Sequence, residues 1–195
     1  MVIPSARIVA PEMRSEFGPI PPALIPLGGR PAMRYILESA APGSSAVIAG
    51  HEGLDLLQDA ASRIVSLSVV DVGPTTSLGQ TVLRALDGAC ELSGRRLVVN
   101  FADTLVSDLP AGGDAVVYRV QSDCYRWTTF SLDAEWGIGE ITEKEVEKHG
   151  ADLFPVFVGV FAFADADAFL ECLSGALAAS DAKLDPLYTA VASYV

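Results

Sequence analysis

The 195-residue sequence is poor in the residues that build disulfide frameworks and histidine metal sites. It contains three widely spaced cysteines and only two histidines, His51 and His149. An odd number of separated cysteines suits neither a disulfide framework nor a zinc site, and it predicts reduced thiols in a cytoplasmic protein. Two histidines are too few for a metal cluster built from imidazoles.

Long hydrophobic runs and positive charge are also scarce. The apolar runs are short and interrupted, so we expect no membrane span and no membrane partner, and the N-terminus lacks the pattern of a signal peptide. Thirteen basic residues face 25 acidic ones, and this net charge of −12 argues against a nucleic-acid partner. Half of the residues are hydrophobic, which excludes a disordered chain and predicts a single domain over residues 1–195.

The few positive charges are unevenly distributed. Residues 1–34 hold four arginines and two glutamates, a net charge of +2, so the rest of the chain carries −14. A locally basic segment in an acidic protein suits a compact anionic ligand such as a phosphate. The alternative is that these arginines lie there by chance and form surface ion pairs.

The hydrophobic pattern of the first half predicts alternating strands and helices. Near-continuous apolar runs predict strands at 1–5, 45–50, 63–73 and 95–106, and helical spacing predicts helices at 32–41, 53–62 and 75–89. Apolar runs without strict alternation are typical of strands covered on both faces. The order therefore predicts a parallel sheet with right-handed crossovers. Residues 5–30 are expected to form a long irregular connection.

The second half shows more polar alternation. Strands are predicted at 114–121 and 125–133, a hairpin corner at 134–145, an apolar strand at 154–163 and two closing helices after it. The predicted fold class is therefore α/β, a three-layer, mostly parallel sheet with helices on both faces and an antiparallel hairpin extension in the second half.

Asp103 follows a predicted buried strand directly. A carboxylate at the carboxyl end of such a strand is costly unless it is paired or binds a cation. One interpretation is a magnesium ligand, and the alternative is a helix cap or turn aspartate. Ligands of open parallel sheets bind beyond the carboxyl ends of the strands. We therefore expect Asp103, the loop after residue 5 and the turn at 75–79 to meet.

Several segments resemble the sugar-phosphate nucleotidyltransferase family. The strap IPPALIPLGGRPAMRYILE is similar to the family's IPKALIPVGGKPMIEYVLE, RLVVNFADTL to FLVVNGDTL, and TTSLGQTVLRAL to GTAGALLLAL. In addition, WTTFSLDAEWGIGEITEK resembles the hairpin that runs into EKP, and FPVFVGVFAFADADAFLECL resembles NAGIYVFDPEAFLEAL. The matches occur in the family's order, from residue 2 to about 173. The resemblance implies a nucleotide-diphospho-sugar transferase-like fold and, as in the family, dimers or larger homo-oligomers.

The resemblance also implies an Mg²⁺-dependent reaction. The phosphate of a sugar or polyol would attack the α-phosphorus of a nucleoside triphosphate, a nucleoside monophosphate group would be transferred, and pyrophosphate would leave. Asp103 would hold the Mg²⁺, Arg7 and Arg14 would contact the triphosphate, and Lys144 would meet the acceptor phosphate.

The same resemblance assigns residues to the base and to the sugar. The nucleotide-binding residues would be Ser77, Leu78, Gly79 and Gln80, with Gln80 placed to hydrogen-bond a base edge. On the substrate side, Trp127 could stack on a sugar or be a core or edge aromatic. Gly159 keeps the glycine of the family's NAG motif.

Three departures from the family pattern favour a different function, a catalytically degenerate module for ligand sensing or partner assembly. The first loop has no glycine before Gly18, Pro22 stands at the position of the family lysine, and the chain stops before the family's second metal-binding aspartate. Either the sequence is truncated at its C-terminus or the site lacks a second carboxylate. A glycosyltransferase would usually present two aspartates one residue apart, and residues 102–105 lack the second one.

Overall fold

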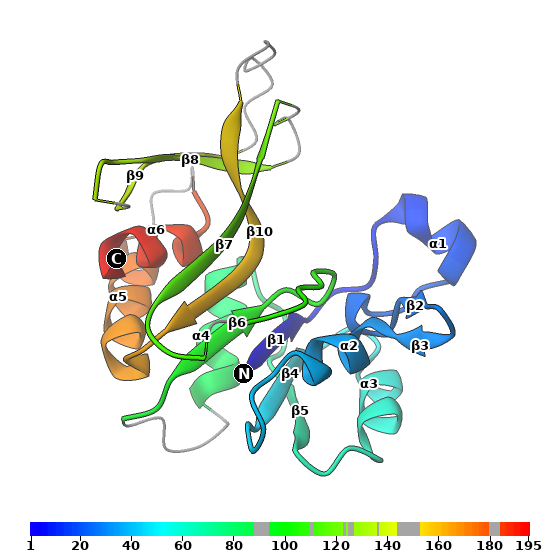
Figure 1. Cartoon of the computed structure of the whole chain (residues 1–195). Helices are drawn as coiled ribbons and strands as arrows, with labels where there is room; N and C mark the ends of the chain where they lie inside the picture. The colour runs from blue at the N-terminus through cyan, green and yellow to red at the C-terminus, as the bar shows by residue number, and fades with distance from the viewer. Residues whose placement is uncertain are drawn as a thin grey trace.

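The fold is built around one mixed β-sheet (Figure 1). The computed structural model describes residues 1–87, 94–109, 111–122, 124, 127–135, 137–143, 153–179 and 184–195. The strand order is β5-β4-β1-β6-β10-β8-β9, and β7 pairs with β10.

The core of the sheet is parallel. It consists of β1 (Val2–Ser5), β4 (Ala46–Gly50), β5 (Leu67–Asp71) and β6 (Leu97–Asn100), with β1 lying between β4 and β6. These are the four strands that the apolar runs predict. From β1 the chain moves outward through β4 and β5, and it then returns to β6 on the other side of β1. The reversal in strand order therefore falls between β1 and β6.

The later strands are antiparallel. The long strand β10 (Phe154–Phe163) pairs with β6 and also with β7 (Ala115–Gln121) and β8 (Thr128–Leu132). Strand β9 (Ile138–Glu143) pairs with β8, and Figure 1 shows this hairpin on the side of the molecule where α6 lies. The predicted class, a parallel core with an antiparallel extension and helices packed on it, is confirmed.

Helices cover both faces of the sheet. The helices α4 (Leu78–Asp87), α5 (Ala166–Ala179) and α6 (Pro186–Tyr194) contribute to one hydrophobic cluster, and α2 (Ala32–Glu38) and α3 (Leu54–Ala61) contribute to another. The neighbouring residues Val2 and Ile3 of β1 belong to different clusters, and both are almost fully buried. This two-sided burial explains why the parallel strands are continuously apolar.

The prediction of an irregular connection over residues 5–30 is wrong. This segment contains the helix α1 (Pro11–Phe17), the 3₁₀ turn η1 (Pro22–Leu24) and the hairpin formed by β2 (Pro26–Leu27) and β3 (Arg30–Pro31). Helix α1 buries no residue, so it leaves no apolar period in the sequence. Proline begins both α1 and η1, where its fixed φ favours a helical start.

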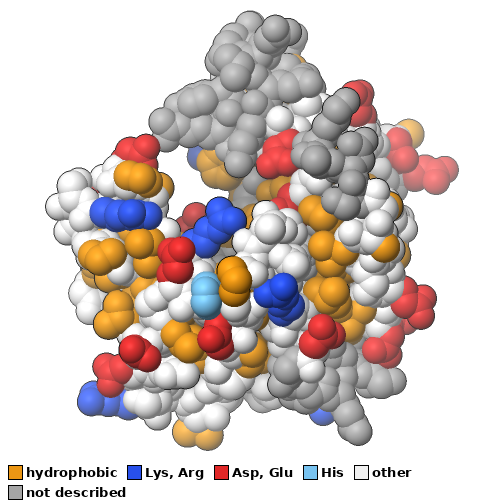
Figure 2. All heavy atoms as spheres, turned by 180° about the vertical axis from the view of Figure 1, so that it is seen from behind, with side chains coloured by type: hydrophobic (Ala, Val, Ile, Leu, Met, Phe, Trp, Pro, Cys, Tyr) orange, Lys and Arg blue, Asp and Glu red, His pale blue; other side chains and the backbone are white. Residues whose placement is uncertain are grey.

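The surface carries charges of both signs. Figure 2 shows acidic and basic side chains interspersed on the face that it displays, with no single basic patch among the residues drawn in colour. In the described part of the chain, no helix has the length and apolar character needed to cross a membrane. The Cys124 thiol is buried and donates to the carbonyl of Gln121 at 3.4 Å, Cys172 is a free, partly buried thiol, and Cys90 lies outside the described residues.

Candidate functional site

A cleft of about 390 Å³ lies at the carboxyl end of the parallel strands. Its walls come from the end of β1, the residues after β6, the turn before α4, the start of α6 and the last residue of β9. Strands β1 and β6 flank the reversal in strand order, which is where ligands bind in open α/β sheets. Residues far apart in the sequence therefore converge at the point that the topology favours.

Four of the predicted site residues line this cleft. They are Arg7, Ser77, Leu78 and Asp103. Asp103 is exposed just after the end of β6, where its carboxylate lies 3.4 Å from the Thr104 hydroxyl oxygen. The Arg7 guanidinium donates to the carbonyl of Thr75 at 3.2 Å, so it connects the loop after β1 to the turn before α4.

Arg14 and Trp127 do not line the cleft. Arg14 lies on α1, where its Nε donates to the carbonyl of Val9 at 2.9 Å. The Trp127 side chain is 37% exposed, and its backbone N–H donates to the carbonyl of Cys124. Lys144, the residue predicted to meet the acceptor phosphate, lies outside the described residues.

Gly79 and Gln80 also lie off the cleft and serve local structure. Gly79 is buried where α4 meets α6, and a Cβ at this position would lie 2.9 Å from the backbone nitrogen of Leu187. The Gln80 side-chain oxygen accepts hydrogen bonds from the Thr76 N–H at 2.8 Å and from its hydroxyl at 3.3 Å. The Gln80 side-chain oxygen, which was predicted to hydrogen-bond a nucleobase, thus stabilises the turn before α4.

Gly159 forms a close packing contact beside the end of β6. It has a φ of +91° at the irregularity between Phe157 and Val160 of β10, and an added Cβ would overlap the ring of Phe101. Its carbonyl accepts from the Phe101 N–H at 2.8 Å, and the neighbouring Val158 carbonyl accepts from the Thr104 hydroxyl at 2.5 Å. These contacts hold both ends of the segment that carries Asp103.

Sequence reasoning missed the residues that β9 and the start of α6 contribute to the cleft: Glu143, Asp185 and Tyr188. Asp185 and Tyr188 belong to the start of α6, which the pattern predicted only as a closing helix. The Asp-Pro pair at 185–186 does indicate a helix start, because aspartate caps helices and proline favours the first turn. Nothing in the local pattern places that helix start beside residue 103.

Tyr188 presents a hydroxyl that stays protonated at neutral pH. The pKa of Tyr188 is raised to about 12, mainly by burial; a hydrogen bond with Thr128 opposes this shift, and the charges of Asp185, Glu143 and Asp103 contribute to it. Its ring is stacked on Phe157, with 5.1 Å between the centroids. The cleft therefore contains a rigid phenol that can donate a hydrogen bond to a ligand.

The charge of the cleft suits a bound cation. Among its described residues, three carboxylates (Asp103, Glu143, Asp185) face one guanidinium, Arg7. The described residues contain no group of three His, Cys, Asp or Glu side chains arranged to hold a metal. Mg²⁺ commonly binds through one or two carboxylates together with waters and substrate phosphates. Asp103 therefore fits an Mg²⁺ that arrives with a phosphorylated ligand.

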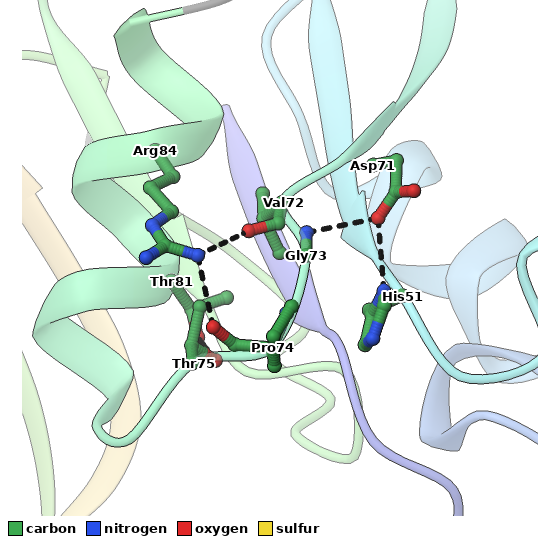
Figure 3. Close-up of polar contacts among 8 residues, drawn as sticks. All are labelled: His51, Asp71, Val72, Gly73, Pro74, Thr75, Thr81 and Arg84. Carbon is green, nitrogen blue, oxygen red and sulfur yellow. Dashed lines mark hydrogen bonds and ion pairs between the residues drawn. The ribbon is translucent and has the colours of Figure 1, made fainter.

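Polar contacts hold the segment between β5 and α4 in place (Figure 3). Asp71 Oδ1 accepts from the Gly73 N–H at 2.9 Å and contacts His51 Nδ1 at 3.0 Å. Arg84 donates to the carbonyls of Val72 and Pro74 at 2.8 and 2.9 Å. The Gly73 hydrogen bond and then His51 lower the pKa of Asp71. Asp71 therefore adds stability above its unfolded pKa, and this contribution is lost as the pH falls through the lowered folded value.

Comparisons with solved structures show the class of fold. A scan of protein-family models gave no match, and a search of curated proteins gave none either. A nucleoside-diphosphate-sugar pyrophosphorylase from Vibrio cholerae superposes with a TM-score of 0.70 at 12% identity, over 99% of this chain and 88% of that chain. A CTP:phosphocholine cytidylyltransferase from Streptococcus pneumoniae superposes with a TM-score of 0.62 at 14% identity, over 98% of this chain and 83% of that chain.

A UTP-bound UGPase from Acinetobacter baumannii gives a TM-score of 0.61 at 18% identity, over 98% of this chain and 80% of that one. The chain therefore has the fold of the sugar-phosphate nucleotidyltransferases, in a divergent form. A fold does not by itself fix an activity, which depends on the residues of the cleft.

Proposed function

We propose that this protein is an Mg²⁺-dependent nucleotidyltransferase. It would transfer a nucleoside monophosphate group from a nucleoside triphosphate to a small phosphorylated sugar or polyol, with release of pyrophosphate. The observation that carries the proposal is the convergence of Arg7, Asp103 and the turn 75–78 on one cleft at the reversal in strand order.

The chemistry of phosphoryl-type transfer suits these residues. Such reactions depend on positioning and charge neutralisation more than on a covalent group from the protein. When bound at Asp103, Mg²⁺ would neutralise charge on the phosphates and on the departing pyrophosphate. Arg7 would donate to phosphate oxygens, a role that suits the planar guanidinium and that can replace contacts from a glycine-rich loop.

Different walls of the cleft would contact different parts of the bound ligand. The turn at Ser77 and Leu78 would contact the nucleoside, because it is held rigidly and faces the cleft. Tyr188, on the wall formed by α6, would donate a hydrogen bond to a phosphate or hydroxyl oxygen. Lys144 follows β9 directly and remains the proposed partner of the acceptor phosphate.

The activity is tested by measuring pyrophosphate release. The purified protein is incubated with Mg²⁺, with each common nucleoside triphosphate in turn, and with a panel of sugar phosphates, polyol phosphates and phosphocholine. Release that requires one nucleotide, one acceptor and Mg²⁺ together is the expected result. Nucleotide binding without turnover for any acceptor would contradict the enzyme proposal.

A specific observation favours the second candidate, a ligand-sensing module. Pro22 lines the cleft at the position where the family pattern has a lysine, and the remaining described charges of the cleft are mostly negative. A missing charge-assisted hydrogen bond weakens phosphate binding by roughly 1.5–3 kcal/mol. Binding without turnover in the assay above is the result that supports this alternative.

Pro22→Lys is expected to strengthen nucleotide binding. The new ammonium would reach the cleft and form a charge-assisted contact, so the Kd for Mg²⁺–nucleotide should fall by roughly tenfold or more. Removing the proline that begins η1 should cost about 0.4–1 kcal/mol of stability. Pro26→Lys is the matched control, because Pro26 is exposed on the same strap and does not line the cleft. Equal effects of the two substitutions in calorimetric titrations would show that net charge alone is responsible.

Tyr188→Phe is expected to weaken ligand binding while keeping the ring packing. Loss of one neutral hydrogen bond should lower kcat/KM by roughly 5- to 10-fold. Tyr194→Phe is the control on the same helix, because the Tyr194 hydroxyl donates to Asp114 at 2.8 Å and does not line the cleft. The control should lower the melting temperature slightly and leave the kinetics unchanged, and an unchanged kcat/KM in Tyr188→Phe would exclude a ligand contact.

A further inference from the structure

The Asp185 carboxylate connects the starts of two helices, α4 and α6, which lie more than 100 residues apart in the sequence. Its Oδ2 accepts from the Leu78 N–H at 2.7 Å, and its Oδ1 accepts from the N–H groups of Gly79 and Leu187 at 3.0 Å each. The Asp185 backbone N–H in turn donates to the Glu143 carboxylate at 3.2 Å. One side chain thus holds together the starts of α4 and α6 beside the end of β9.

The close approach of the two helix starts creates a need for this carboxylate. A Cβ on Gly79 would lie 2.9 Å from the nitrogen of Leu187, so the first turns of α4 and α6 are in direct contact. Each helix N-terminus carries a partial positive charge of about half an elementary charge. Two such ends repel one another, and a carboxylate between them converts the repulsion into attraction.

The bonds of Asp185 satisfy N–H groups at the α4 N-terminus. The first N–H groups of a helix have no intrahelical acceptor and often bind anions. In α4 the Leu78 and Gly79 N–H groups donate to Asp185, and the Gln80 N–H donates to the Ser77 hydroxyl at 3.0 Å. The Thr81 N–H donates to the Ser77 carbonyl at 3.2 Å, which is the first regular hydrogen bond of the helix. The N–H groups of residues 78–80 are therefore already bonded within the protein.

We infer that Asp185 is a positioning residue of the cleft and that it excludes phosphate from the start of α4. By holding Leu78 and Gly79, it fixes the wall that faces the nucleoside. By occupying the helix end, it leaves Arg7 and Asp103 as the groups of the cleft that meet the phosphates of a nucleotide. The identity of this ligand rests on the proposed function, whereas the role of the carboxylate between the helices does not.

The test compares Asp185→Ala and the near-isosteric Asp185→Asn with Asp165→Ala. Asp165 is a matched control, because its carboxylate also accepts an N–H at a helix start, that of Ala168 at 3.0 Å, and it does not line the cleft. Melting temperatures, amide hydrogen exchange of Leu78 and Gly79, and calorimetric Kd values for Mg²⁺ with ATP, CTP, GTP and UTP are measured. The titrations are made at a temperature where every variant is folded.

Both Asp185 variants are expected to lose amide protection at Leu78 and Gly79 and to bind the preferred nucleotide at least about tenfold more weakly. Asp185→Ala should melt roughly 5–10 °C below the wild type, and Asp165→Ala roughly 2–4 °C below it with an unchanged Kd. Wild-type nucleotide affinity in Asp185→Asn would overturn the positioning role. Unchanged protection of the two amides would overturn the contact itself.

A second measurement separates this inference from the proposed function. Formate can occupy the space left by the removed carboxylate in Asp185→Ala, so sodium formate should raise its melting temperature above that in equal sodium chloride. Replacing sodium chloride with sodium formate should not change the melting temperature of the wild type. If the wild-type protein binds no nucleotide, the proposed function fails. The melting temperatures in formate and the amide hydrogen exchange of Leu78 and Gly79 still decide the role of Asp185 between the helices. Equal melting in formate and chloride would count against an anion site at the two helix starts.

Discussion

Asp103→Asn is expected to reduce pyrophosphate release by roughly 10²- to 10³-fold, the scale of losing a principal electrostatic contribution to a transition state. The substitution preserves the shape of the side chain and removes the charge that would hold Mg²⁺ at the end of β6. Asp103 is exposed, so the folded protein should be almost as stable as the wild type. The Kd for nucleotide should rise with Mg²⁺ present and change little without it.

Asp108→Asn is the control for this substitution. Asp108 is exposed and lies five positions further along the chain, and it does not line the cleft. The Asp108→Asn substitution removes one negative charge, as Asp103→Asn does, and leaves the proposed metal ligand unchanged. Turnover within a few-fold of the wild type in Asp103→Asn would contradict the assignment of Asp103, whatever the control shows.

Gly159→Ala is expected to destabilise the protein by about 3–5 kcal/mol. Two costs combine, because alanine is strained at a φ of +91° and its methyl group would overlap the Phe101 ring. Phe101 begins the segment that leads to Asp103, so a shift of the ring should also displace the proposed metal ligand. Urea unfolding followed by fluorescence or circular dichroism measures the loss.

Gly175→Ala is the control, and it is expected to raise the stability measured by urea unfolding. Gly175 lies within α5, and an added Cβ would meet no atom within 4 Å. Alanine is a better helix former than glycine, so this variant should be more stable by about 0.5–1 kcal/mol. A small effect of Gly159→Ala, similar in size to that of Gly175→Ala, would show that Phe101 adjusts freely and that the packing contact is unimportant.

The parallel core could be predicted from the sequence because burial on both faces leaves a continuous apolar signal. Strands β1, β4 and β6 carry that signal most clearly, whereas the edge strand β5 is partly exposed and contains Ser68 and Asp71. The strand-end position of Asp103 then follows from the topology. The convergence of Arg7, Ser77 and Leu78 with Asp103 was expected on the same grounds, because the carboxyl ends of parallel strands share one edge.

The remaining features of the cleft depend on contacts between distant segments. Asp185 and Tyr188 approach Asp103 only because α6 packs beside α4, and no local pattern encodes that contact. The exposed helix α1 has no apolar period to reveal it. A glycine such as Gly79 can allow the close approach of either a ligand or a neighbouring helix. Only the position of Leu187 shows that Gly79 makes room for a helix.

The most direct test of the account is a calorimetric titration of the wild-type protein with ATP, CTP, GTP and UTP, each with and without Mg²⁺. At least one nucleotide is expected to bind with one site per chain, and markedly more tightly with Mg²⁺ than without it. Absence of binding for every nucleotide, or binding that is indifferent to Mg²⁺, would contradict the claim that Arg7 and Asp103 form a site for a metal-bound polyphosphate.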